Sequence, residues 1–104
     1  MSDEATSPKV VDNPAKNRFE ATMEGHTATM KYKLKDNTMT VEHTTVPPEL
    51  QGRGLAGKLA QTCIETARER GLTITPVCEV VLGYMKKRPE THDLLSEEGK
   101  KAIS

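Results

Sequence analysis

The first half of the chain alternates hydrophobic and polar residues with a period of two. This alternation runs through residues 19–23, 28–34 and 39–43. A period of two predicts strands that bury one face. Gly25 and Asn37 lie in the polar breaks between these segments, and both residue types suit tight turns. We therefore expect an antiparallel meander of three strands.

The alternation slips at the end of the third of these strands. Val46 has the opposite parity to the two apolar residues before it in the strand, Met39 and Val41. One extra residue in a strand is the usual cause of such a slip. We expect a β-bulge near Thr44 or Thr45, and we expect the two prolines after Val46 to end the strand, because proline donates no backbone hydrogen bond.

The second half of the chain predicts two helices around one further strand. An apolar residue recurs at every fourth position in residues 55–70, with polar residues opposite, which is typical of an amphipathic helix. Gly71 follows, where a left-handed helix cap favours glycine. Residues 72–77 predict a strand parallel or adjacent to the third strand. Residues 80–88 predict a second helix that stops before Pro89.

These elements make one small domain of mixed α/β (α+β) class, since 104 residues suit a single core. The expected fold is a three-stranded antiparallel meander, a fourth strand after a crossover helix, and a second helix on the C-terminal side. The domain should span residues 17–95. Residues 1–16 should form a flexible N-terminal arm, with one short edge strand as an alternative, and residues 96–104 a flexible C-terminal tail.

Composition limits the function classes. Fifteen basic residues balance fifteen acidic ones, so no net charge attracts nucleic acid or anionic lipid. Aromatic residues make up 3% of the chain and tryptophan is absent, which removes a stacking surface for bases. Without an apolar span or signal-like segment, we expect a cytoplasmic protein with reduced cysteines, and neither a membrane nor nucleic acid as partner.

A glycine-rich segment, residues 51–58, joins the prolines to the long helix. A helix that starts in such a segment offers free N–H groups to anions. Gly52, Gly54 and Gly57 match the dinucleotide pattern G-x-G-x-x-G, but that motif must follow a strand directly, and two prolines intervene here. The segment also matches G-x-x-x-x-G-K, yet Leu59 stands where nucleotide triphosphatases need Ser or Thr.

A third pattern in the same segment is Q-x-x-G-x-A, at Gln51, Gly54 and Ala56. It resembles the pyrophosphate-binding loop of the GNAT superfamily of acyl-coenzyme A dependent N-acetyltransferases. The likeness covers about residues 17–95, counted from the order of motifs and elements. Three stretches are similar to the small single-domain branch of this superfamily: H-T-T-V-P-P-E-L-Q-G-R-G-L-A at 43–56, P-V-C at 76–78 and K-R-P-E at 87–90.

The resemblance implies that acetyl-coenzyme A is the co-substrate. The third strand would splay from the fourth, and the pantetheine arm would pair with the exposed strand edge. The pyrophosphate would meet N–H groups at the start of the helix. Arg53 and Lys58 would add charge, or else be solvated surface residues. The coenzyme-binding residues implied are Thr44, Thr45, Val46, Gln51, Gly52, Arg53, Gly54, Leu55, Ala56, Gly57 and Lys58.

Two residues are the leading candidates for catalysis. His43 lies just before the predicted bulge and suits a general base near neutral pH. Cys78 falls where the fourth strand gives way to the second helix, whose N-terminus favours a thiolate nucleophile. The resemblance implies a catalytic role for His43 and places Cys78 beside the thioester, although Val80 stands where family members commonly carry an aromatic residue. The alternatives are a histidine packed against the helix and a small buried cysteine.

Other polar residues are weaker candidates. Glu42 is a reserve base that alternates to the opposite face from His43, unless the bulge re-aims one of them. Tyr84 could protonate a leaving thiolate or belong to the core, and Cys63 falls in the apolar row of the long helix. The histidines and cysteines show no metal-ligand spacing, so no metal is expected.

The leading hypothesis is an N-acetyltransferase that moves an acetyl group from acetyl-coenzyme A to an unidentified amine, which a protein could carry. The alternative is a non-catalytic acyl-coenzyme A binding module or scaffold with a GNAT-like fold. A weaker third possibility is a nucleic-acid accessory role of basic residues 86–88 and 100–101, against which the balanced charge argues. A monomer is expected.

Overall fold

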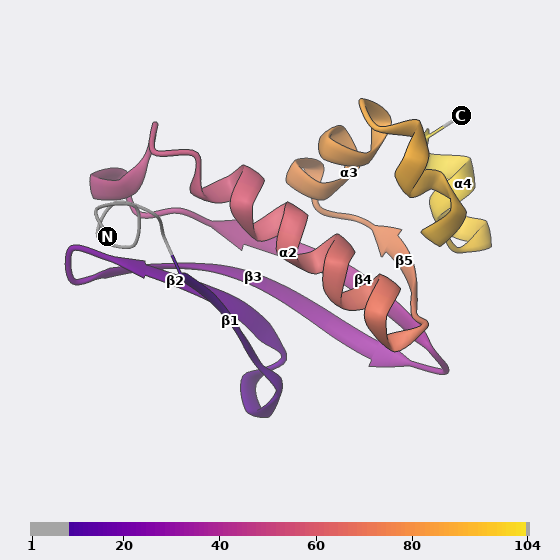
Figure 1. Ribbon diagram of the computed structural model, residues 1–104, viewed down its shortest axis with the longest axis horizontal. Coiled ribbons are helices and arrows are strands. Elements are labelled where there is room, and N and C mark those ends of the chain that lie inside the picture. The colour runs from indigo at the N-terminus through magenta and orange to yellow at the C-terminus, as the bar shows by residue number, and fades with distance from the viewer. Residues whose placement is uncertain (1–8, 104) are drawn as a thin grey trace.

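A computed structural model describes residues 9–103 of the chain. Figure 1 shows its strands and helices in chain order. The strands are β1 (Lys9–Asn13), β2 (Arg18–Met23), β3 (His26–Lys35), β4 (Thr38–Thr45) and β5 (Thr73–Pro76). The helices are α2 (Leu55–Arg70), α3 (Glu79–Lys86) and α4 (Glu97–Ile103), and short 3-10 turns are η1 (Pro14–Lys16), η2 (Pro48–Leu50) and η3 (Pro89–Leu94).

The strands form one sheet in the order β1-β2-β3-β4-β5. Neighbours run antiparallel from β1 to β4, and β5 runs parallel to β4. The parallel pair follows from the connection, because α2 carries the chain back along the sheet before β5 begins. The predicted meander, crossover helix and parallel fourth strand are therefore confirmed, with β1 as an additional strand.

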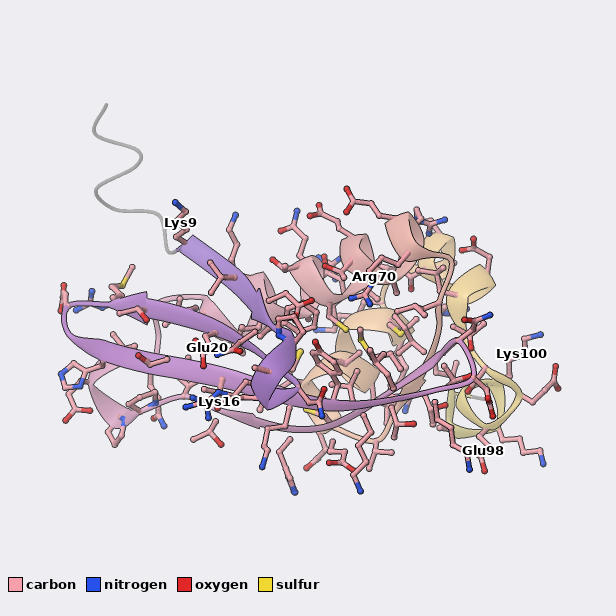
Figure 2. All side chains as sticks on the ribbon, turned by 90° about the horizontal axis from the view of Figure 1, so that it is seen from below. Lys9, Lys16, Glu20, Arg70, Glu98 and Lys100 are labelled. Carbon is pink, nitrogen blue, oxygen red and sulfur yellow. The ribbon has the colours of Figure 1, made fainter. Side chains whose placement is uncertain are left out.

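One face of the sheet is covered by helices and the other is open. Figure 1 shows α2 lying across the covered face, with α3 and α4 beside it near β5. Phe19, Met30 and Val41 point into this layer and are fully buried, and Leu59 meets them from α2. Figure 2 views the molecule from below, where the polar side chains of Lys16 and Glu20 lie on the sheet side of the molecule.

Helix α2 begins and ends at glycines in the left-handed region. Gly54 has a φ of 77° and Gly71 a φ of 68°. The Gly71 N–H donates to the carbonyls of Ala67 and Arg68, which closes the last turn. The prediction of a long amphipathic helix capped by Gly71 is confirmed.

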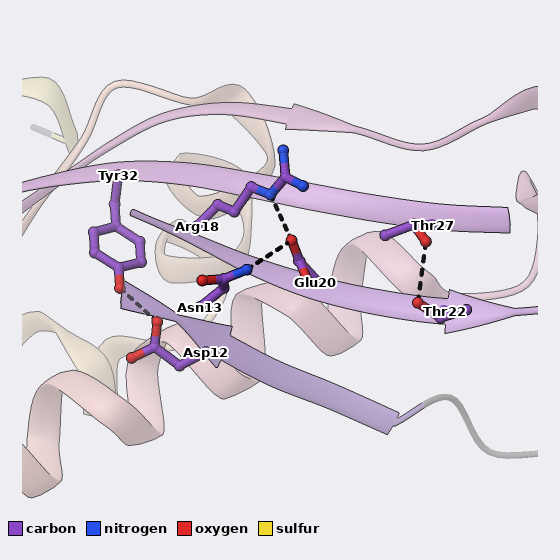
Figure 3. Close-up of polar contacts among 7 residues, drawn as sticks. All are labelled: Asp12, Asn13, Arg18, Glu20, Thr22, Thr27 and Tyr32. Carbon is purple, nitrogen blue, oxygen red and sulfur yellow. Dashed lines mark hydrogen bonds and ion pairs between the residues drawn. The ribbon is translucent and has the colours of Figure 1, made fainter. Parts of the chain in front are cut away.

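Strand β1 is held by a buried tyrosine (Figure 3). The hydroxyl of Tyr32, on β3, donates to a carboxylate oxygen of Asp12, whose other oxygen lies 3.5 Å from Arg70 of α2. Burial and the Asp12 carboxylate both raise the pKa of Tyr32. Of the predicted N-terminal arm, residues 1–8 lie outside the described residues, and residues 9–13 form the short edge strand that was the alternative.

The bulge lies earlier in β4 than the sequence predicts. His43 pairs with Lys31 and Val41 with Tyr32, so Glu42 is the extra residue. The prediction of a bulge near Thr44 or Thr45 is wrong by two to three positions. Beyond Glu42 the parity reverses, and Thr44 and Val46 take the helix-facing side.

The predicted C-terminal tail needs a correction, because residues 97–103 form α4. Ser96 donates its N–H to the Ile74 carbonyl at 2.9 Å, and Leu95 forms a bridge with Ile74. Gly99 is buried where a Cβ atom would lie 2.8 Å from the Ile74 carbonyl oxygen. Glycine at this position therefore allows α4 to rest directly on β5.

Gly99→Ala should destabilise the protein by about 1–3 kcal/mol, since the new methyl group meets backbone that cannot move aside. Gly83→Ala is the matched control: it lies inside α3 with open space around the new Cβ, and should stabilise by about 0.5–1 kcal/mol. Urea unfolding measures both. A Gly99→Ala variant as stable as the parent would contradict this account of the α4 contact.

Candidate functional site

Strands β4 and β5 separate halfway along β4. Their pairing ends at Val41 and Pro76. The Val41 carbonyl oxygen accepts hydrogen bonds from the N–H groups of Val77 (3.1 Å) and Cys78 (2.9 Å), and the chain then turns into α3. From Glu42 onward β4 is paired with β3 alone. The splay that the GNAT resemblance implies is thus present.

A cavity of about 400 Å³ lies where the strands separate. It brings His43 and Cys78, the two catalytic candidates, to the walls of one space. The remaining wall comes from the bulged end of β4 and the start of α3. Its lining residues are Glu42, His43, Thr44, Val77, Cys78, Glu79 and Val80.

Cys78 is the N-cap residue of α3 and is 7% exposed. Its Sγ lies 3.0 Å from Oγ1 of Thr44, within hydrogen-bond distance for either donor. The sequence pointed to Thr44 for its backbone alone and gave no role to this hydroxyl. The parity reversal at the bulge was the available clue, because it turns Thr44 toward the helix layer.

His43 lies on the open face of the sheet. It pairs with Lys31, whose neighbour Tyr32 points to the opposite, buried side. The imidazole is therefore exposed, and the alternative of a histidine packed against the helix is wrong. The bulge at Glu42 meets the exception stated for this residue, because Glu42 and His43 line the same cavity.

The cavity wall carries negative charge. Glu42 and Glu79 contribute carboxyl groups, and the sequence places no lysine or arginine among the lining residues. The Lys33 ammonium on the neighbouring strand lies 3.4 Å from a Glu42 carboxylate oxygen. A cationic group is thus favoured at this wall.

The glycine-rich segment presents a row of free backbone donors. Among residues 9–103, the N–H groups of residues 52–57 donate no hydrogen bond, and the first bond of α2 runs from Lys58 N–H to the Gly54 carbonyl. No side chain caps this helix start. Gly52 and Gly54 hold φ angles of 82° and 77°, and no atom lies within 4 Å of where their Cβ atoms would be. The backbone is open to an anion, and the helix dipole favours one.

Gln51 connects this segment to the cavity. Its side-chain amide donates to the Val46 carbonyl at 3.3 Å. Val46 directly follows β4, whose last residues have no pairing with β5. The glycine-rich segment and the cavity therefore lie at the two ends of one exposed strand edge.

Three predicted loop residues differ in their surroundings. Arg53 forms a two-pronged ion pair with Glu24 of the β2–β3 turn, at 2.9 and 3.1 Å, so it is already engaged. Leu55 is 1% exposed and can offer only its N–H group. Lys58 is exposed, and its side chain makes no hydrogen bond or ion pair with residues 9–103.

Of the weaker candidates, Glu42 lines the cavity, whereas Tyr84 and Cys63 are not among its lining residues. The Tyr84 ring packs under the Arg88 guanidinium, 3.8 Å from its centre. Cys63 is fully buried, and burial raises the pKa of its thiol to about 12, with a smaller effect from Cys78. Among the described residues no group of three His, Cys, Asp or Glu could hold a metal ion. None of the helices described is long and apolar enough to cross a membrane.

Comparisons with known proteins agree with this geometry. A family model described as GCN5-related N-acetyl-transferase matches residues 18–94, which include the whole loop and cavity. A solution structure from Staphylococcus aureus, described as a candidate GCN5-like N-acetyltransferase, superposes with a TM-score of 0.65. It is 25% identical, over 85% of this chain and 87% of that chain.

The two thiols should differ in reactivity. At pH 8 iodoacetamide should alkylate Cys78 in the cavity and spare Cys63, which is fully buried and protonated well above that pH. Peptide mapping by mass spectrometry identifies the modified residue. Cys78→Ser should remain unlabelled and Cys63→Ser should label like the parent, whereas labelling of Cys63 in the folded protein would contradict the assignment.

Proposed function

The chain belongs to the GCN5-related N-acetyltransferase family, and from this membership we propose that it binds acetyl-coenzyme A and transfers the acetyl group to an amine. The observation that carries the proposal is the row of free N–H groups at residues 52–57, joined through Gln51 to the unpartnered edge of β4. The two features suit the two polar parts of the coenzyme, its pyrophosphate and its amide-bearing arm.

The residues at the start of α2 fit a pyrophosphate. The two phosphate groups of a pyrophosphate need several donors with little steric obstruction, and the glycines there leave open space beside the backbone. Lys58 adds a positive charge in the first turn, while Arg53 contributes by fixing the loop against Glu24. The arm then follows Thr44, Thr45 and Val46 toward the cavity.

His43 and Cys78 act on the reacting groups in this proposal. The amine must lose a proton before it attacks, and His43 on the cavity wall accepts that proton. Cys78 either holds the thioester in place, with Thr44 fixing its sulfur, or takes the acetyl group first and passes it to the amine. In either route the amide forms as the carbon–sulfur bond breaks, and the departing thiolate is protonated.

The acceptor reaches the cavity from the open face of the sheet, because His43 lies there. The carboxyl groups of Glu42 and Glu79 favour an acceptor that arrives as an ammonium ion. The proposal extends to a monomer acting in the cytoplasm, with neither nucleic acid nor a membrane as partner, supported by the balanced charge of the chain.

Gly54→Glu should abolish acetyl-coenzyme A binding, because a carboxylate would stand among the phosphate donors. The matched control is Gly71→Glu at the other end of α2, about 24 Å away. Gly71 also has a positive φ and open space around it, so the added strain and charge are equal. Titration followed by amide NMR measures affinity and reports whether each variant is folded.

The parent protein should show shifts in residues 43–58 and around Cys78. Unchanged affinity in folded Gly54→Glu would remove the loop from the site. Absence of any shift at millimolar ligand would overturn the proposal as a whole, and binding without acetyl transfer to any amine would favour the non-catalytic binding module.

Acetyl-coenzyme A alone should add one hydroxylamine-sensitive acetyl group if Cys78 is a nucleophile, since hydroxylamine cleaves a thioester and spares an amide. Intact mass measured before and after hydroxylamine detects it. The labile group should be absent from Cys78→Ser and present in Cys63→Ser. A parent protein without a labile group would rule out the acetyl-Cys78 route and favour direct transfer or binding alone.

A further inference from the structure

One residue of the cavity wall, Glu42, already forms an ion pair with an amine of the same chain. Nζ of Lys33 lies 3.4 Å from Oε2 of Glu42, and Glu42 lines the cavity that holds His43 and Cys78. The Lys33 side chain is 75% exposed, so solvent gives it freedom to move. It presents a primary amine on a four-carbon chain, the form in which a lysine acceptor would arrive.

The geometry of β3 and β4 explains this position. Lys33 pairs with Thr40 and shares the open face of the sheet with Lys31, which pairs with His43. The bulge at Glu42 adds a residue to β4 between these two pairs. Glu42 therefore stands diagonally opposite Lys33, and the two side chains meet across the β3–β4 pair.

Two neighbouring lysines lack this relation. Lys31 and Lys35 lie on the same strand and the same face as Lys33, and both are also exposed. Neither forms an ion pair with any residue from 9 to 103. They differ from Lys33 in position relative to the Glu42 carboxylate and serve as internal references.

We propose that Lys33 is an acetyl acceptor built into the chain, so that the protein acetylates its own Lys33 from acetyl-coenzyme A. The inference rests on the proposed function and names a modification site for it. Glu42 receives the proton that the Lys33 ammonium must lose, since the two groups already form an ion pair. Glu42 and His43 then divide the proton chemistry of the cavity between an internal and an external amine.

The step balances as an ordinary aminolysis of a thioester. Glu42 takes one proton from the ammonium of Lys33, and the lone pair of Nζ attacks the thioester carbonyl carbon. A carbon–nitrogen bond forms and the carbon–sulfur bond breaks. The second proton lost by nitrogen goes to the leaving thiolate, which gives acetyl-Lys33 and free coenzyme A. Glu42 returns its proton to solvent.

Acetylation would change the cavity that produced it. An acetylated lysine is neutral and gives up its ion pair, so the Glu42 carboxylate loses its internal partner. The cavity wall then gains one unneutralised negative charge. The modified protein is better suited to bind an external ammonium ion at Glu42 than the unmodified one.

The test incubates the full chain with acetyl-coenzyme A, removes thioesters with hydroxylamine, and quantifies acetyl-lysine by peptide mass spectrometry. Lys33 should be acetylated about tenfold faster than Lys31 or Lys35 in the same sample, because proximity raises the effective concentration of its amine. The rate per molecule should not depend on protein concentration. Amide resonances of Glu42 and His43 should shift as the acetyl group is added.

Variants separate the steps. Glu42→Gln should lower Lys33 acetylation to the level of Lys31, and Lys33→Arg should remove the main acetyl-lysine signal, which Lys31→Arg should retain. Gly54→Glu should suppress it and Gly71→Glu should not. If acetyl-coenzyme A binds but Lys33 reacts no faster than Lys31 and Lys35, the inference is overturned and the proposed function stands. If the coenzyme does not bind, both fail.

Discussion

The carbonyl oxygen of Val41 determines where this sheet opens. It accepts the N–H groups of both Val77 and Cys78, and with that double hydrogen bond the ladder between β4 and β5 ends. The chain after Pro76 turns into α3, and Cys78 is the N-cap residue of that helix. On β4 the bulge at Glu42 follows Val41 directly. The cavity, the position of the thiol and the free edge of β4 all depend on this one acceptor.

The sequence predicted the strands and the helix in which the spacing of apolar residues marks the buried face. Alternation located the meander, and the fourfold spacing from Leu55 located α2, because buried positions must be apolar whatever the rest of the fold. The bulge was predicted but placed too late in the strand, because polar residues do not show which face they occupy. Residues 42–45 are all polar, so the slip became visible only at Val46 and its position within that stretch was hidden. Helix α4 was missed because its docking depends on the absence of a side chain at Gly99.

The candidate site was predicted in part. Periodicity and the resemblance together pointed to His43, Cys78 and the glycine-rich segment, and the structure gathers the first two around one cavity. Contacts between distant positions were not readable. The partner of Arg53 is Glu24, 29 residues away in the chain, and nothing in either local pattern indicates the pair. The face of the sheet on which His43 lies was equally unpredictable, since one inserted residue moves the side chain to the opposite face.

The contact of residues 95 and 96 with Ile74 also changes what the outer border of the sheet offers to another strand. A small sheet with one open face has two outer strands whose free backbone groups could pair with another copy. Ser96 and Leu95 occupy the outer side of β5, and β1 at the opposite end is five residues long and halted by Pro14. Neither outer strand therefore offers a long free edge for pairing. Along β5 the C-terminal segment therefore stands where another strand would pair, while the gap beyond Val41 stays open.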